Sequence, residues 1–227
     1  MTAGTRRERQ SSEFRRHRVR LKISREASRL FLQQGVAATG GDQIARVVGV
    51  STRTVWRHFH SKESLIEPII RQGISREMAA LRRWQPQCSL EDHLTGEFAE
   101  YIRSAPASER ADHELAVRVI VLTETEPALR TAWLTACHQA EGELAEIISA
   151  RLDLPADSAE IQLLTAAASG AIRVVNEEMA GAALRGAPAG QALQMHAMLS
   201  RAVRNATGGT IGDPVTAPTR KGEPRSL

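Results

Sequence analysis

Cysteines, aromatic residues and long apolar runs are scarce in this chain of 227 residues. Cys88 and Cys137 are the only cysteines and stand at no metal-binding spacing, so we expect neither a disulfide framework nor a zinc site. Aromatic residues make up 4% of the chain, which leaves Leu, Ile, Val and Ala to build the core and favours helices. No run approaches the roughly 18 apolar residues of a membrane-spanning helix, and the first residues lack the apolar segment of a secretory signal. We therefore expect a cytoplasmic protein with no membrane partner.

Positive and negative charges are divided unevenly along the chain. Residues 1–62 hold fourteen Lys and Arg against four acidic residues, a balance of +10, whereas residues 63–206 hold thirteen against twenty, a balance of −7. Residues 207–227 hold three against two, and the net charge of the whole chain is +4. A basic end on an acidic body is typical of a polyanion-binding module joined to a body with another task. The alternative is a disordered basic leader on a protein of another kind.

The spacing of apolar residues predicts helices along most of the chain and no strand of convincing length. The pattern over 23–31 marks a helix that Gly35 ends. Further helices are expected over 41–48, 52–59, 62–83, 90–104, 127–152, 161–181 and 189–206, and another is expected to begin at Ser108. Inside the helix predicted over 62–83, Pro68 removes one backbone hydrogen bond, so we expect a bend there. Residues 207–227 are rich in Gly, Pro, Thr and charge and are expected to be disordered.

The stretch 42–59, DQIARVVGVSTRTVWRHF, has the pattern of a helix-turn-helix. Each short helix has an apolar inner face, formed by Ile44, Ala45 and Val48 on the first and by Val55 and Phe59 on the second. Gly49 can take the positive φ that a sharp turn between helices needs, and Ser51 is placed to cap the second helix. The pattern alone also fits helical hairpins in proteins that do not bind DNA.

The run from Phe14 to Ile70 resembles the N-terminal domain of the tetracycline-repressor (TetR) family of bacterial transcriptional regulators. The matching elements, in their usual order, are Ala27 with Leu30-Phe31, Gly35, Thr39, Ile44-Ala45, Gly49-Val50-Ser51, Thr54-Val55-Trp56-Arg57-His58-Phe59, Ser61-Lys62-Glu63 and Leu65. Three positions depart from the common pattern. Trp56 stands where the family often has tyrosine, Thr52-Arg53 replaces a small residue or proline-glycine, and Gly40 replaces a threonine that caps a helix.

The resemblance implies an all-α protein with two helical domains. The expected organisation is a basic disordered arm over 1–12, a three-helix helix-turn-helix DNA-binding domain over 13–62, a helical-bundle domain for effector binding and dimerisation over 63–206, and a disordered tail over 207–227. The implied function is that of a transcriptional regulator, by family default a homodimeric repressor that a small-molecule effector releases from a palindromic double-stranded DNA operator. No enzyme activity and no cofactor are expected. A helical protein–protein adaptor and a helical enzyme with a basic leader are the alternatives, and salt-dependent DNA binding separates the regulator from both.

The chemistry of the second short helix agrees with contact to DNA. A recognition helix presents its N-terminal residues to base edges, where Arg53 can make a bidentate contact to guanine. Thr54 and Trp56 can donate hydrogen bonds to phosphates. Lys62 lies in the first turn of a predicted helix, where the dipole disfavours a cation unless a phosphate binds there as well. The predicted DNA-contacting residues are Thr39, Ser51, Thr52, Arg53, Thr54, Trp56, Arg57, His58 and Lys62.

Expectations for the body rest mainly on the resemblance. The residues that lie on helices lining effector pockets in the family are Met78, Trp84, Phe98, Tyr101, Trp133 and Cys137. The family dimerises through its last two helices, and the small-residue run 166–171 would let a partner helix approach closely. An apolar stripe of this kind also fits an intramolecular core. The histidines of the body, His93, His113 and His138, match no metal-ligand spacing, so no metal site is expected.

Overall fold

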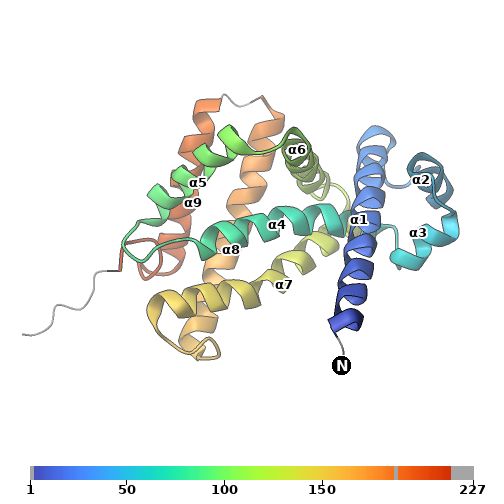
Figure 1. Cartoon of the computed structure of the whole chain (residues 1–227). Helices are drawn as coiled ribbons and strands as arrows, with labels where there is room; N and C mark the ends of the chain where they lie inside the picture. The colour runs from blue at the N-terminus through green and yellow to red at the C-terminus, as the bar shows by residue number, and fades with distance from the viewer. Residues whose placement is uncertain (1–2, 187–188, 216–227) are drawn as a thin grey trace, which may run out of the picture.

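The computed structural model describes residues 3–186 and 189–215, with side chains from residue 12 to 186 and from 196 to 215. Within these ranges the chain forms helices and no strands, which confirms the predicted all-α class (Figure 1). The elements are α1 (Ala3–Gln34), α2 (Gly41–Val48), α3 (Thr52–His58), the 3₁₀ helix η1 (Glu63–Ile66), α4 (Glu67–Arg82), α5 (Leu90–Ser104), α6 (Ala107–Leu122), α7 (Pro127–Leu152), α8 (Ala159–Leu184) and α9 (Ala189–Ala206).

The helix-turn-helix end and the body share one hydrophobic core. Helices α1 to α3 lie together at one end of the molecule, and α4 to α9 form the body (Figure 1). Phe31 of α1, Ile44 of α2 and Val55 of α3 belong to the same buried cluster as Val119 of α6 and Trp133 of α7. A second cluster lies wholly in the body, among α4, α5, α7, α8 and α9. The buried cluster therefore continues across residue 62, where the sequence predicts the boundary between the two domains. That boundary stays a prediction.

The two ends of the described chain are more ordered than predicted. Helix α1 begins at Ala3, so most of the expected disordered arm is helical, because the Arg-, Glu- and Gln-rich run has no proline to stop it. The beginning of the expected disordered tail, residues 207–215, packs on the body. Ile211 is buried there, and the backbone N–H of Leu90 donates to the carbonyl oxygen of Gly212 at 2.8 Å. Residues 216–227 lie outside the described residues.

The predicted long helix over 62–83 is two elements. Just before the first of them, Oγ of Ser61 accepts from the N–H of Ser64, while the N–H of Ser61 donates to Oγ of Ser64, both at 3.2 Å. The residues that follow form η1, and α4 starts only at Glu67, with Pro68 in its first turn. A proline there lacks an N–H that would have no partner within the helix in any case. The expected bend inside a helix is therefore wrong.

Candidate nucleic-acid interface and ligand cavity

Local capping fixes the angle between α2 and α3. Gly49 ends α2 with φ 79°, and its N–H and that of Val50 both donate to the carbonyl oxygen of Ala45 at 2.9 Å. Ser51 then caps α3, since its Oγ accepts from the N–H of Thr54 at 3.1 Å. Only glycine takes this left-handed conformation without strain. The turn predicted from the sequence is confirmed.

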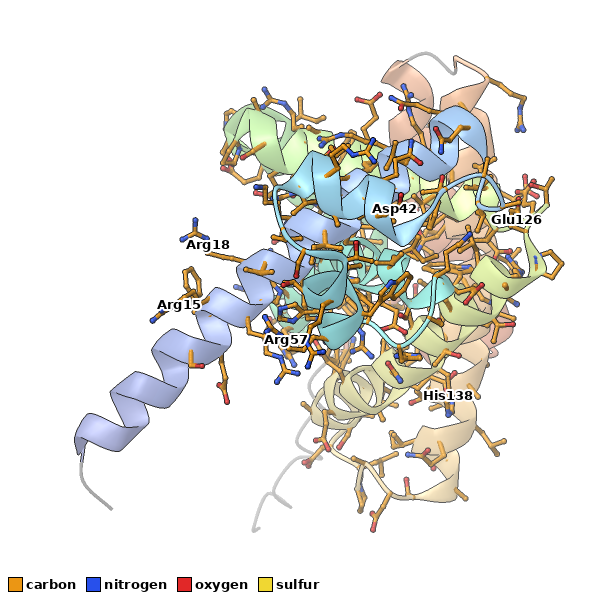
Figure 2. All side chains as sticks on the ribbon, turned by 90° about the vertical axis from the view of Figure 1, so that its right-hand side faces the viewer. Arg15, Arg18, Asp42, Arg57, Glu126 and His138 are labelled. Carbon is orange, nitrogen blue, oxygen red and sulfur yellow. The ribbon has the colours of Figure 1, made fainter. Side chains whose placement is uncertain are left out.

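The outer face of α3 is polar and positively charged. Val55 is buried against α2, whereas Arg53 and Arg57 are exposed and Thr52 is partly exposed. In Figure 2, which faces this end of the molecule, Arg57 lies on α3, and Arg15 and Arg18 project from the part of α1 that extends beyond the body. This end therefore presents arginines from two helices to solvent.

The pKa of His58 is lowered by burial and in part by the positive charges at this end of the molecule. Burial lowers the pKa of His58, and the neighbouring charges of Arg57, Arg16 and Arg20 lower it further. Arginines of α1 thus lie close enough to the C-terminal end of α3 to act on its last residue. A face on which like charges repel one another favours an anionic ligand such as the DNA backbone.

Trp56 is held against the first residue of α2. A Cβ atom built on Gly41 would lie 2.7 Å from Cε2 and 2.8 Å from Nε1 of the Trp56 indole, and closer still to Cζ2. The indole therefore occupies the space that any side chain at Gly41 would need. It remains 40% exposed, so a flat aromatic surface lies beside the exposed arginines. Trp56, which stands where the family often has tyrosine, therefore requires a glycine at position 41 on the facing helix.

Gly41→Ala is expected to destabilise the protein by about 1–2 kcal/mol, because crowding the indole outweighs the gain of replacing glycine in a helix. Chemical denaturation followed by circular dichroism measures the effect. Gly73→Ala is the matched control, since a Cβ there meets nothing within 4 Å and should stabilise helix α4. In a Trp56→Ala background the cost at Gly41 should disappear. An equal cost in both backgrounds would show that the indole is not responsible.

Two of the predicted DNA-contacting residues have internal partners. Thr39 is buried, and its Oγ1 donates to the carbonyl oxygen of Gly35 at 2.8 Å, so its side chain is not available to DNA. Nζ of Lys62 donates to the carbonyl oxygens of Val36 at 3.0 Å and Ala37 at 3.4 Å. These two carbonyl oxygens lie just after α1. They give the Lys62 ammonium group the negative partner that a DNA phosphate was predicted to provide. Contact between Lys62 and DNA stays a prediction.

The remaining predicted residues lie together on the outer side of the helix-turn-helix. These are Ser51, Thr52, Arg53, Thr54, Trp56, Arg57 and His58, all fully or partly exposed. Oγ1 of Thr54 is 2.8 Å from Oγ of Ser51, so these two hydroxyl groups bond to each other at the start of the helix. The structure therefore groups the residues as expected for a recognition helix, while their contacts with DNA stay predictions.

Two small cavities, each of about 30 Å³, lie within the described part of the body. The first lies among α4, α5, α7, α8 and α9, is almost wholly apolar, and includes the predicted Trp84. The second lies among α4, α7 and α8 and includes the predicted Met78, Trp133 and Cys137. Volumes of this size accommodate a few water molecules, whereas ligand pockets measure about 300–1,000 Å³. A larger ligand would have to displace side chains or move these helices apart.

Two residues predicted for the pocket lie outside both of these cavities. Phe98 packs its ring on His196, with 4.6 Å between ring centroids. Tyr101 lies under the guanidinium of Arg76, 4.9 Å from its ring centroid, and edge-on to His113. Neither Phe98 nor Tyr101 lines either of these two cavities, and their assignment to an effector pocket stays a prediction. The spacing of residues along α5 does not reveal that these side chains contact His196, Arg76 and His113.

Sequence reasoning missed the acidic residue that both cavities share. Glu77 lines both, and its carboxylate accepts hydrogen bonds from Nδ2 of Asn176 at 3.2 and 3.4 Å. Burial raises the pKa of Glu77 to about 7, while the bond from Asn176 and the charge of Arg76 act in the opposite direction. The available signal was a charged residue between Ile74 and Leu81 on the apolar face of α4.

A second missed feature ties the DNA-binding end to the body. The guanidinium of Arg25 on α1 makes a bidentate contact to Asp112 on α6, with Nε to Oδ1 at 2.6 Å and Nη2 to Oδ2 at 2.5 Å. The Asp112 side chain is only 7% exposed. On α6 the next residue, His113, bonds Arg76 of α4 through Nδ1 at 2.7 Å. Helix α6 therefore contacts both α1 and the helix that carries Glu77.

Comparisons with known proteins agree with this geometry. The family model described as bacterial regulatory proteins, tetR family, matches residues 23–69, and the model described as MftR C-terminal domain matches residues 89–188. The chain is 34% identical over 136 residues to the HTH-type transcriptional regulator TcmR of Streptomyces glaucescens. That match covers 59% of this chain and 60% of the relative. The chain belongs to the TetR family of bacterial regulatory proteins.

Solved structures show the same fold. Salmonella enterica GusR superposes with a TM-score of 0.51 at 18% identity, covering 85% of this chain and 95% of GusR. A tetR-family transcriptional regulator from Streptomyces coelicolor superposes with a TM-score of 0.50 at 19% identity, covering 85% and 86% of the two chains. Across the described residues, no helix combines the length and apolarity needed to span a membrane.

Proposed function

We propose that this protein is a homodimeric DNA-binding repressor that a small-molecule effector releases from a palindromic operator. The observation that carries the proposal is the exposed polar face of α3, with Arg53 and Arg57 on it and Arg15 and Arg18 nearby on α1. Arginine reads guanine in the major groove and also binds phosphates, and a helix of this kind fits that groove.

Selection of bound sequences from random duplex DNA tests the proposal. The purified full chain should enrich a palindrome whose half-sites lie about one helical turn apart. Its affinity should fall as salt rises, because each phosphate contact releases bound counterions. A flat salt dependence with no enriched sequence would favour the adaptor or the enzyme instead.

Arg53→Ala is expected to relax base preference at one position of each half-site, at a cost of about 1–3 kcal/mol there. The reason is the loss of a bidentate contact to a base edge, which a phosphate contact does not replace. Repeated selection with the variant measures the change. Arg118→Ala on α6 is the control, since it removes an exposed arginine of the body. Identical sequence profiles for wild type and Arg53→Ala would remove Arg53 from base recognition.

The dimer is proposed to form through α8 and α9. Leu163 and Val174 on α8 are 72% and 48% exposed, and Met198 on α9 is also exposed. Between them on α8, a Cβ built on Gly170 would meet nothing within 4 Å, so the small residues leave room beside the helix. An apolar stripe on the surface is typical of an interface between subunits. Two recognition helices related by two-fold symmetry would then address the two half-sites.

The effector is proposed to act by spreading the helices around the two cavities. Helix α4 lines both cavities and also packs on α6 and α1. A ligand that shifts α4 or α6 would therefore move elements that contact the DNA-binding end. It can change DNA affinity only by binding the two arrangements of the body unequally, typically by about 1–3 kcal/mol.

A further inference from the structure

The two cavities are halves of one interrupted space. Three residues line both of them, Glu77, Leu144 and Ile172. Side chains from α4, α7 and α8 therefore form the partition, and moving the partition would join the halves. The first half is lined by leucine, isoleucine and tryptophan side chains, and the second also contains polar groups. A ligand that fills both halves passes the Glu77 carboxyl group at its middle.

Glu77 is the carboxylate in this space that has no cation of its own. Within the described part of the chain it forms no ion pair, and its hydrogen-bond donor is the neutral amide of Asn176. Arg173 is the cation that lines the second cavity, and its Nη1 lies 3.1 Å from Oε1 of Glu177. Glu177 also bonds Nη1 of Arg130 at 2.8 Å and Nε1 of Trp133 at 2.7 Å. Arg173 is thus already paired, and Glu77 is not.

The pKa values of Glu177 and Glu77 also show that only Glu177 has cationic hydrogen-bond donors. Burial raises the pKa of Glu177, but hydrogen bonds from Arg130, Trp133 and Arg173 outweigh it and lower the pKa below its ordinary value. Glu77 has no such cationic donors, and burial raises its pKa to about 7. Cys137 in the second cavity stays a neutral thiol, because burial raises its pKa to about 12. A cation placed at Glu77 would therefore supply the missing charge, whereas an anion would meet a carboxylate.

We propose that the joined cavity binds an apolar amine, with the ammonium group on the Glu77 carboxylate and apolar groups extending into the halves on either side. The amine N–H groups donate to the carboxylate, and Asn176 holds that carboxylate in place. Leu81, Trp84 and Leu94 enclose one apolar group, and Met78 and Trp133 enclose the other. The inference rests on the proposed function only for the role of this ligand as an effector.

Three probes that carry the same two benzyl groups test the ligand class. Dibenzylamine, dibenzyl ether and dibenzylacetic acid each place two phenyl groups around a centre that is cationic, neutral or anionic. Binding to the full chain is measured by isothermal titration calorimetry at about pH 8, where Glu77 is mostly ionised. The amine should bind at least about tenfold more tightly than the ether, and the acid should bind most weakly.

Glu77→Gln keeps the shape of the side chain and removes its charge. It should weaken binding of the amine about tenfold or more and leave the ether unchanged. Glu146→Gln on the exposed side of α7 is the matched control and should change neither affinity. Equal or tighter binding of the acid by wild type, an unchanged affinity of Glu77→Gln for the amine, or no binding of any probe up to its solubility would each overturn the proposal.

The DNA-binding assay on the same preparations separates this inference from the proposed function. Wild type that ranks the probes as expected but binds no DNA would refute the regulator and leave the ligand class standing. Wild type that binds its operator but ranks the acid first would refute the ligand class and leave the regulator standing.

Discussion

Arg25→Met is expected to lower the free energy of unfolding by about 3–5 kcal/mol, because it leaves the buried Asp112 carboxylate without its bidentate partner. The contact joins α1 to α6, and both of its hydrogen bonds are short, at 2.6 and 2.5 Å. Asp112 is 7% exposed and Arg25 31% exposed, so water compensates the loss only in part. Denaturation by urea, followed by circular dichroism, measures the change.

Arg29→Met is the matched control for this prediction. Arg29 lies one helical turn further along α1, has a side chain that is 47% exposed, and pairs with Glu26 on the same helix. Surface pairs of this kind contribute about 0–1 kcal/mol. The double variant Arg25→Met with Asp112→Leu should recover most of the lost stability, since it removes the unpaired charge as well. Equal effects of Arg25→Met and Arg29→Met would show that the contact to α6 contributes little.

The variant with both Leu163→Glu and Val174→Glu is expected to be monomeric at micromolar concentration. Two carboxylates on the exposed face of α8 would face two more across a symmetric interface, where they would be desolvated beside like charges. Affinity for a palindromic operator should fall about 100-fold or more, because the two half-sites are no longer bound together. Light scattering gives the mass and a gel-shift titration gives the affinity.

The matched control carries Ile102→Glu and Leu134→Glu. These residues are exposed apolar side chains on α5 and α7, outside the proposed interface, so the same change in charge should leave mass and operator affinity unaltered. A dimeric mass for the Leu163 and Val174 variant would place the interface elsewhere. Loss of the dimer in the control as well would mean that added negative charge, rather than the α8 face, is responsible.

The parts of the fold that could be predicted from the sequence are those decided over a few residues. Gly49 and Ser51 act on groups within four positions of themselves, and the ends of α2, α3, α5 and α7 follow from nearby caps and prolines. For the same reason the recognition helix could be named before its surroundings were known. The structure differs where distant packing decides, as in the ordered segment 207–215, where Ile211 is buried and Gly212 accepts a hydrogen bond from Leu90.

The parts of the site that escaped prediction depend on residues far apart in the chain. Arg25 and Asp112 are 87 positions apart, and Glu77 and Asn176 are 99 apart. No spacing rule connects such pairs. The burial of Thr39 could not be predicted either. A polar residue in a turn is usually exposed, but Thr39 is buried and donates a hydrogen bond to Gly35. Phe98 and Tyr101 were assigned by their helix rather than by the direction of their side chains.

The segment that follows α9 gives the first cavity a wall that lies apart from the helix-turn-helix. Ile211 lines the first cavity, and Nη2 of Arg151 donates to the carbonyl oxygens of Asp213 at 2.9 Å and Pro86 at 3.2 Å, which fastens the segment to the body. Ile211 belongs to the core cluster of the body, apart from the one shared with the helix-turn-helix. Substitutions at Ile211 can therefore reshape the first cavity without changing the cluster that packs the helix-turn-helix against the body.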